Sequence, residues 1–268
     1  MADSFYVPLG ADTWRATGHT TGPWDERAQH GGPPSALLGR AIQRHAPRDD
    51  MIIARFTCEI LGAIPVGELT VTARLTRPGR SVEFLEAVAR ADGRDVARAS
   101  AWRVLRTQSD SAGQRGSPPP LPAEASGPPP DGWIDGYLSA VEWRPVAGHF
   151  GAPGPATVWA RLRYPLVADE ETGPLERVLA IADSGNGLSG ELDISGWHFI
   201  NPELTVHLHR EAAGEWICLD AQTTISAGGT GLATSVISDE GGAVGEGAQA
   251  LLVSPRRPAP RPDGSGRR

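Results

Sequence analysis

The stretch PPSALLGRAIQRH, residues 33–45, is the part of the sequence that decides the fold. Its apolar side chains recur along one face of a helix: Leu37, Leu38, Ala41 and Ile42. Two prolines stand in the first helical turn, where a missing N–H costs nothing. Four runs rich in Val, Thr, Leu and Phe follow, separated by Gly, Pro or Asp-Gly turns, near 52–61, 68–77, 81–91 and 95–106. A helix followed by antiparallel strands predicts an α+β unit in which one face of the sheet packs on the helix.

The same order of elements occurs a second time. A helix is expected near 174–184, and strand-type runs follow it near 199–210, 215–226, 230–238 and 243–253. A shift of 148 positions sets Thr57 on Thr205, Gly93 on Gly241 and Val96 on Val244, and a shift of 147 sets Gly67-Glu68 on Gly214-Glu215. Short strand-like stretches precede each helix, at 3–8 and 13–20 and at 137–144 and 157–164. The two halves therefore look like copies of one unit.

A segment rich in Pro, Ser and Gly separates the copies at residues 107–132, and it holds too few large apolar side chains to form a core. We therefore expect one domain over 1–106, a linker over 107–132 and a second domain over 133–255. The tail RRPAPRPDGSGRR, residues 256–268, is expected to be disordered.

Composition limits the classes of partner. The net charge of −7 over 268 residues argues against nucleic acid and acidic membrane surfaces, which attract clustered cations. Cys58 and Cys218 lie in apolar runs without pairing or metal-type spacing, so buried free thiols are expected. The chain has no apolar run of about 20 residues and no signal-type N-terminus, which favours a cytoplasmic protein. His207 and His209 share a strand face but lack a third ligand, so no metal site is predicted.

Four short stretches together resemble the acyl-CoA thioesterase II family: QHGGPPSALLGRA (29–41), ADSGNG (182–187), NPELTVHLHR (201–210) and AQALLV (248–253). The resemblance spans most of residues 14–106 and 157–253. It implies a tandem double hotdog, two antiparallel sheets each wrapped around a central helix and joined side by side. It also implies an acyl-CoA or acyl-carrier thioester as substrate, bound between the halves, and no cofactor. Leftover sheet edges make a homodimer reasonable.

The resemblance also suggests which residues carry the chemistry. Asp183 matches the residue that activates the hydrolytic water, and Gln249 matches an amide that holds this water. In the family a third residue, a Thr on the strand after the Asp, also holds this water. Its counterpart here is either Asn201, which the alignment selects, or Thr205. Because side chains alternate along a strand, Asn201 and Thr205 are expected on one face, where either could bond a water beside Asp183.

Other residues are expected to contact the substrate. Backbone N–H groups at a helix start can stabilise an oxyanion, and Gly32 is the chosen donor, with Gly31 allowing close approach. His30 precedes the two glycines and is expected to contact the thioester. Arg77 and Arg80 are candidate contacts for the phosphates of coenzyme A.

Two other functions stay open. A hotdog dehydratase or hydratase usually needs an Asp–His pair on one loop, and no such pair follows Asp183. The chain could also be a non-catalytic module that binds acyl thioesters or lipids, because Asn201 stands where the family has a Thr.

Overall fold

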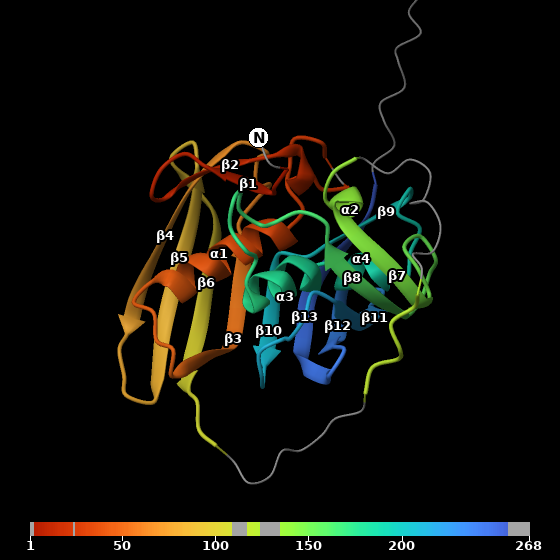
Figure 1. Ribbon diagram of the computed structural model, residues 1–268. Helices are drawn as coiled ribbons and strands as arrows, with labels where there is room; N and C mark the ends of the chain where they lie inside the picture. The colour runs from red at the N-terminus through yellow and green to blue at the C-terminus, as the bar shows by residue number, and fades with distance from the viewer. Residues whose placement is uncertain (1–2, 24, 109–116, 124–134, 257–268) are drawn as a thin grey trace, which may run out of the picture.

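The computed structural model describes residues 3–23, 25–108, 117–123 and 135–256. In these residues thirteen strands form one antiparallel sheet (Figure 1). The strands of the first half are β1 (Tyr6–Pro8), β2 (Thr13–Ala16), β3 (Met51–Ile60), β4 (Glu68–Arg77), β5 (Val82–Ala91) and β6 (Arg94–Leu105). Those of the second half are β7 (Val141–Ala147), β8 (Ala156–Leu162), β9 (Trp197–Ile200), β10 (Glu203–Leu208), β11 (Ile217–Ile225), β12 (Thr230–Asp239) and β13 (Gly242–Pro255).

The strand order repeats the internal duplication. It runs β1-β2-β4-β5-β6-β3 and then β10-β13-β12-β11-β8-β7, with β9 paired to β13 alone. The halves meet where β3 pairs with β10, and Thr57 lies directly opposite Thr205 with 3.2 Å between their hydroxyl oxygens. These are the residues that the shift of 148 superposes. A pseudo-two-fold axis therefore passes between them.

Two helices lie side by side on the same face of the sheet (Figure 1). They are α1 (Gly32–Arg44) and α3 (Pro174–Ala182), and their apolar side chains belong to one core cluster that extends over both halves. Gly32 allows the helices to approach, because a Cβ there would collide with the backbone oxygen of Ala180. The close contact brings the N-terminus of α1 to the C-terminus of α3.

The expected helix and four long strands of the first half are present with bounds within one residue of those expected, whereas the short strands expected at 3–8 and 13–20 span only 6–8 and 13–16. The second half differs in a detail that affects the site. The run 199–210 is two strands, β9 and β10, interrupted at Asn201 and Pro202. Proline has no N–H to donate to a sheet ladder, so the strand breaks there. Two short helical segments also occur inside stretches expected to be extended, a 3₁₀ turn at Gly18–Thr20 and α2 at Tyr137–Ala140.

Part of the predicted linker packs on the outer face of the second half. The indole nitrogen of Trp159 donates to the carbonyl of Pro119 at 3.1 Å, and Arg144 donates to that of Pro122 at 2.7 Å. Leu121 packs against a small cluster that contains Trp159, Trp216 and Cys218. Residues 109–116 and 124–132 of the linker, and the predicted tail beyond Arg256, lie outside the described residues, and the division into domains stays a proposal.

Cys58 and Cys218 are both free and buried, as the sequence predicts. Within the described ranges, no helix combines the length and the apolar character that crossing a bilayer requires.

Candidate active site

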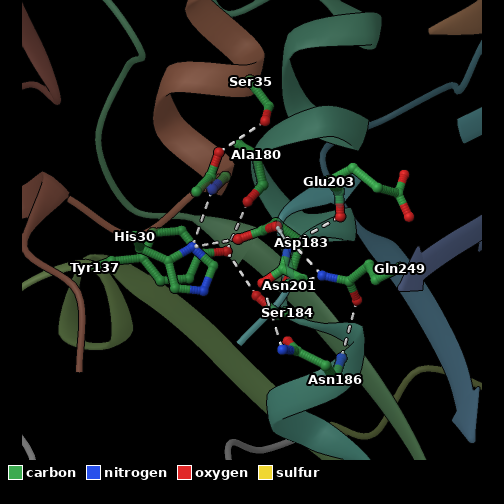
Figure 2. A network of polar contacts seen from close by, with 12 residues as sticks. His30, Ser35, Tyr137, Ala180, Asp183, Ser184, Asn186, Asn201, Glu203 and Gln249 are labelled. Carbon is green, nitrogen blue, oxygen red and sulfur yellow. Dashed lines mark hydrogen bonds and ion pairs between the residues drawn. The ribbon is translucent and has the colours of Figure 1, made fainter. Parts of the chain in front are cut away.

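Asp183 caps the C-terminus of α3 and is only 3% exposed. The N-terminal end of α1 faces it (Figure 2). A Cβ at Gly31 would lie 2.6 Å from Asp183 Oδ2. Glycine at this position is therefore what lets the first turn of α1 approach the carboxyl. The site forms between elements of the two halves.

Two side-chain amides hold one oxygen of the carboxyl. Asn201 Nδ2 donates to Asp183 Oδ1 at 2.7 Å, and Gln249 Nε2 donates to the same oxygen at 3.2 Å and to the Asp183 carbonyl at 3.0 Å. Gln249 Oε1 accepts from the backbone N–H of Asn186 at 3.1 Å, which fixes the orientation of its amide. Asp183 Oδ2 accepts from neither amide.

His30 lies on the other side of the carboxyl, with its Nδ1 3.3 Å from Asp183 Oδ2. The same nitrogen accepts a hydrogen bond from the Gly32 N–H at 3.1 Å. A ring nitrogen that accepts in this way has no proton to donate, so its contact with Oδ2 is favourable when the Asp183 carboxyl is protonated.

Tyr137 fixes the plane of the His30 ring. The two rings stack with centroids 3.9 Å apart and 8° between their planes. The Tyr137 hydroxyl donates to the Ala180 carbonyl at 2.7 Å and lies 2.9 Å from Ser184 Oγ, so it is anchored at the end of α3 (Figure 2). His30 therefore has a single supported orientation beside Asp183.

Burial dominates the electrostatics of this pair. It raises the pKa of Asp183 to about 7, against the opposing hydrogen bonds from Asn201 and Gln249 and a backbone hydrogen bond from Gly31. Burial also lowers the pKa of His30 to about 3, so its imidazole is neutral at physiological pH. Asp183 thus exchanges its proton in the pH range where a general base is most effective.

The other predicted residues lie elsewhere. Thr205 lies on the outer face of the sheet, because Leu204, Val206 and Leu208 point into the core, and its hydroxyl bonds to Thr57 and Glu203. The expectation that Asn201 and Thr205 share a face is wrong, since the break at Pro202 interrupts the alternation between them.

Arg77 and Arg80 are not brought to the site within this chain. They lie in and beside the hairpin that joins β4 and β5, and β5, β6 and β3 separate β4 from the junction of the halves (Figure 1). Arg77 donates to the carbonyl of Val82 in β5 at 2.8 Å and lies over the ring of Trp102 in β6, so its contacts are with these neighbouring strands.

The sequence did not single out Tyr137, Ser184 or Asn186, whose side chains contact the site residues. Ser184 and Asn186 stand in ADSGNG, the stretch singled out around Asp183, so their position was a usable signal. Tyr137 follows the linker and carries no motif. Among the described residues, no three His, Cys, Asp or Glu side chains gather where they would hold a metal ion.

Comparisons with known families decide what this chain is. The family described as "Acyl-CoA thioesterase N-terminal domain" matches residues 20–104, and "Acyl-CoA thioesterase C-terminal domain" matches residues 115–253. The chain belongs to the acyl-CoA thioesterase family. Membership confirms the resemblance seen in the sequence and supports a thioester hydrolase function at the level of the family. No curated protein sequence matches this acyl-CoA thioesterase family member.

Solved structures resemble it over nearly its whole length. A protein with a hot dog fold from Alicyclobacillus acidocaldarius aligns with a TM-score of 0.71 and 15% identity, covering 94% of this chain and 96% of that one. The acyl-CoA thioesterase II TesB2 of Mycobacterium marinum aligns with a TM-score of 0.63 and 19% identity, covering 98% and 96%. The tesB protein of Mycobacterium avium subspecies paratuberculosis aligns with a TM-score of 0.67 and 17% identity, covering 93% of this chain and 96% of that one. At these identities the likeness establishes the fold, and the predicted α+β double hotdog is confirmed.

Proposed function

We propose that this chain hydrolyses acyl-CoA thioesters with Asp183 as the general base. The observation that carries the proposal is a buried carboxyl between the two halves, with one oxygen held by two amides and a pKa of about 7. Asn201 and Gln249 both donate to Oδ1 of Asp183. We therefore expect Oδ2 to be the oxygen that accepts a proton. Family membership supplies the substrate class.

The reaction follows from these groups. Asp183 Oδ2 takes a proton from a water as the water oxygen bonds to the thioester carbonyl carbon, and the carbonyl electron pair moves to its oxygen. Collapse of this intermediate breaks the C–S bond. The leaving thiolate takes the proton back from Asp183, which yields a carboxylic acid and free coenzyme A. In this scheme His30 stays neutral and contacts the reacting group.

The oxyanion would be stabilised at the N-terminus of α1. Pro33 and Pro34 have no N–H, and the Ser35 N–H is already bonded to the Gly31 carbonyl at 3.1 Å. The Gly31 N–H bonds the Asp183 carboxyl, which leaves Gly32 as the donor. Gly32 donates to His30 Nδ1 in the free protein, and we propose that the thioester oxygen replaces this acceptor. Such a donor contributes about 3–4 kcal/mol to lowering the barrier.

The direct test is release of free thiol from a panel of acyl-CoAs, read with a thiol-detecting reagent. Asp183→Asn should lower turnover by about a hundredfold or more, because the base is lost while the shape is kept. In the wild type, kcat/KM should rise with pH until Asp183 is ionised near pH 7 and then level off. Asp220→Asn is the matched control, since Asp220 is exposed on β11 and bonds only Thr157 among the contacts seen. Turnover that survives in Asp183→Asn would remove the mechanism.

One observation favours a second candidate, a hydratase or dehydratase. The fold brings His30 from the first half to Asp183 in the second, and an Asp–His pair is what that chemistry uses. Crotonyl-CoA separates the two functions. Loss of the enoyl absorbance without thiol release would indicate hydration, and thiol release would indicate hydrolysis. Binding without either change would indicate the non-catalytic module.

A further inference from the structure

A cavity of about 340 Å³ opens beside the Asp183 network. His30, Ser184 and Asn186 line its inner edge, and each of them belongs to the network drawn in Figure 2. The remaining walls come from Pro23, from α2, from the loop after β7 and from the stretch that runs from Gly187 in α4 (Gly185–Leu188) to Phe199 in β9. A group bound here would have one end within reach of Asp183 and the rest outside the polar site.

The walls beyond the inner edge are mainly apolar. Their large side chains are Leu138, Phe150, Leu192, Ile194 and Phe199. Asp193 is the one charged side chain among the described lining residues, and its carboxylate accepts from the backbone N–H and the hydroxyl of Ser195, at 2.8 and 2.7 Å. No Arg of the described ranges lines the cavity. A ligand carboxylate here would lose water without gaining a cation, which is costly.

The size of the cavity limits its occupant. Pockets for small molecules range from about 300 to 1,000 Å³, so this one lies near the lower end. A water takes about 30 Å³ of liquid volume and a methylene is of similar size, so the cavity holds roughly ten such units. That is enough for a medium-length chain or a single aromatic ring, and too little for a long fatty chain.

We propose that this cavity is the acyl-binding pocket and that it selects uncharged acyl groups of up to about ten carbons, with Gly187 and Phe150 setting the limit. The proposal rests on the proposed thioesterase function and names its substrate class. Burying each methylene of such a chain contributes about 0.8 kcal/mol, so affinity should rise with chain length until the pocket is filled.

Gly187 is the position from which the pocket can be narrowed. A Cβ there would meet only Phe150 Cε1, at 3.6 Å, which is ordinary van der Waals contact. Gly187 also has no positive φ, so a larger residue causes no backbone strain. Because a Cβ already touches Phe150, the rest of a leucine side chain would extend past that ring into the cavity that both residues line.

The kinetic test compares acetyl-, butyryl-, octanoyl-, phenylacetyl- and palmitoyl-CoA, with succinyl-CoA as the charged counterpart of butyryl-CoA. In the wild type, kcat/KM should be highest for the octanoyl or phenylacetyl ester and at least about tenfold lower for the palmitoyl and succinyl esters. Gly187→Leu should lower the ratio of octanoyl to acetyl kcat/KM by at least about tenfold. Phe150→Ala should shift the preferred chain to a longer one.

Gly10→Leu is the matched control, because Gly10 is exposed in the β1–β2 turn with open space around it. It should leave the chain-length profile unchanged. The pocket assignment would be overturned if the wild type preferred palmitoyl-CoA. It would also be overturned if Gly187→Leu folded but left the chain-length profile of kcat/KM unchanged. Either result would leave the thioesterase function in place.

A binding measurement tests the pocket without turnover. S-octyl-CoA, a thioether that cannot be hydrolysed, should bind the wild type more tightly than free CoA and should bind Gly187→Leu at least about fivefold more weakly. If no thioester were hydrolysed but this pattern held, the pocket assignment would stand and the proposed reaction would fall. Equal binding of S-octyl-CoA to the wild type and to Gly187→Leu would overturn the pocket assignment.

Discussion

Asp183 occupies a position that is unfavourable for a carboxylate in two respects. It caps a helix C-terminus, where the helix dipole disfavours negative charge, and it is buried away from water. Asn201, Gln249 and the N-terminal end of α1 offset part of this cost. The residual cost is what raises its pKa into the range useful for catalysis, so reactivity is obtained at the expense of stability.

This cost predicts that the Asp183→Asn variant is more stable to unfolding than the wild type, by an amount that depends on pH. Between about pH 4 and 7 the folded chain keeps a proton on Asp183, whose pKa rises from 3.8 to about 7, while the unfolded chain loses it. Wild-type stability therefore falls as the pH rises through this window. An asparagine at this position would mimic the protonated acid, so the variant should be more stable at pH 8 by up to about 4 kcal/mol, with little difference at pH 4. Urea unfolding at both pH values measures this, and an equal difference at both would contradict it.

A second prediction concerns Tyr137, which we treat as a positioning residue. Tyr137→Phe keeps the ring stacked on His30 and loses the bonds to Ala180 and Ser184, whereas Tyr137→Leu loses both. A misplaced group in an active site costs on the order of 10²-fold in rate, so kcat should fall that far in the Leu variant and much less in the Phe variant. Steady-state kinetics on octanoyl-CoA would check it. A Leu variant with unchanged kcat and a raised KM would instead indicate a role in binding alone.

At the scale of the elements, the site depends on how closely α1 and α3 approach. Two glycines of α1 face α3, and they meet different atoms: Gly32 meets the rigid backbone oxygen of Ala180, and Gly39 meets the end of the Leu179 side chain. A methyl group at Gly32 cannot be accommodated without separating the helices, whereas Leu179 can rotate.

Gly32→Ala should therefore destabilise the protein by about 2–3 kcal/mol. Gly39→Ala should change stability by less than about 1 kcal/mol, since alanine also gains about 1 kcal/mol of helix propensity over glycine. Chemical denaturation of the two variants side by side is the measurement. Equal losses would mean that the contact with Ala180 is not what fixes the helix spacing.

Most elements could be predicted because their signals are local. The prolines before Leu37 and the alternating strands bounded by Gly or Pro are enough to place α1 and β3 to β6. The middle residue of the site could not be settled in this way, because side-chain alternation does not continue across Pro202, where the strand is interrupted. The pairing of His30 with Asp183 and Tyr137 joins residues from distant parts of the chain, and no periodic pattern carries that information.

At the scale of the whole molecule, the internal symmetry implies a second position equivalent to the Asp183 site, where the C-terminus of α1 meets the N-terminus of α3. Arg40 fills it. Its guanidinium is buried, bonds Glu170 at 2.6 and 2.7 Å, and lies 4.0 Å from Glu176. The duplication visible in the sequence predicts two equivalent positions, and only the coordinates reveal that this one is closed by ion pairs.

Arg40 thereby ties the two halves together, and this gives a stability prediction. Arg40→Met should cost about 2–3 kcal/mol, because it removes the charge-assisted hydrogen bonds to Glu170 and the cation beside the buried Glu176, while Glu170 keeps its ion pair with Arg44. Arg15→Met is the control, since its ion pair with Glu68 is exposed and should contribute less than about 1 kcal/mol. Thermal or urea unfolding of both variants tests this, and losses of similar size would argue against Arg40 as a structural tie.

The hydrogen bonds from Trp159 and Arg144 to the segment around Pro119 and Pro122 have a consequence for assembly. They fasten the connection midway to the second half, so fewer residues lie between the end of β6 and this anchored segment than the whole linker contains. A shorter tether raises the effective concentration of a half for its own neighbour. We therefore expect the first half to pair with the second half of its own chain rather than to exchange between two chains in a domain-swapped oligomer.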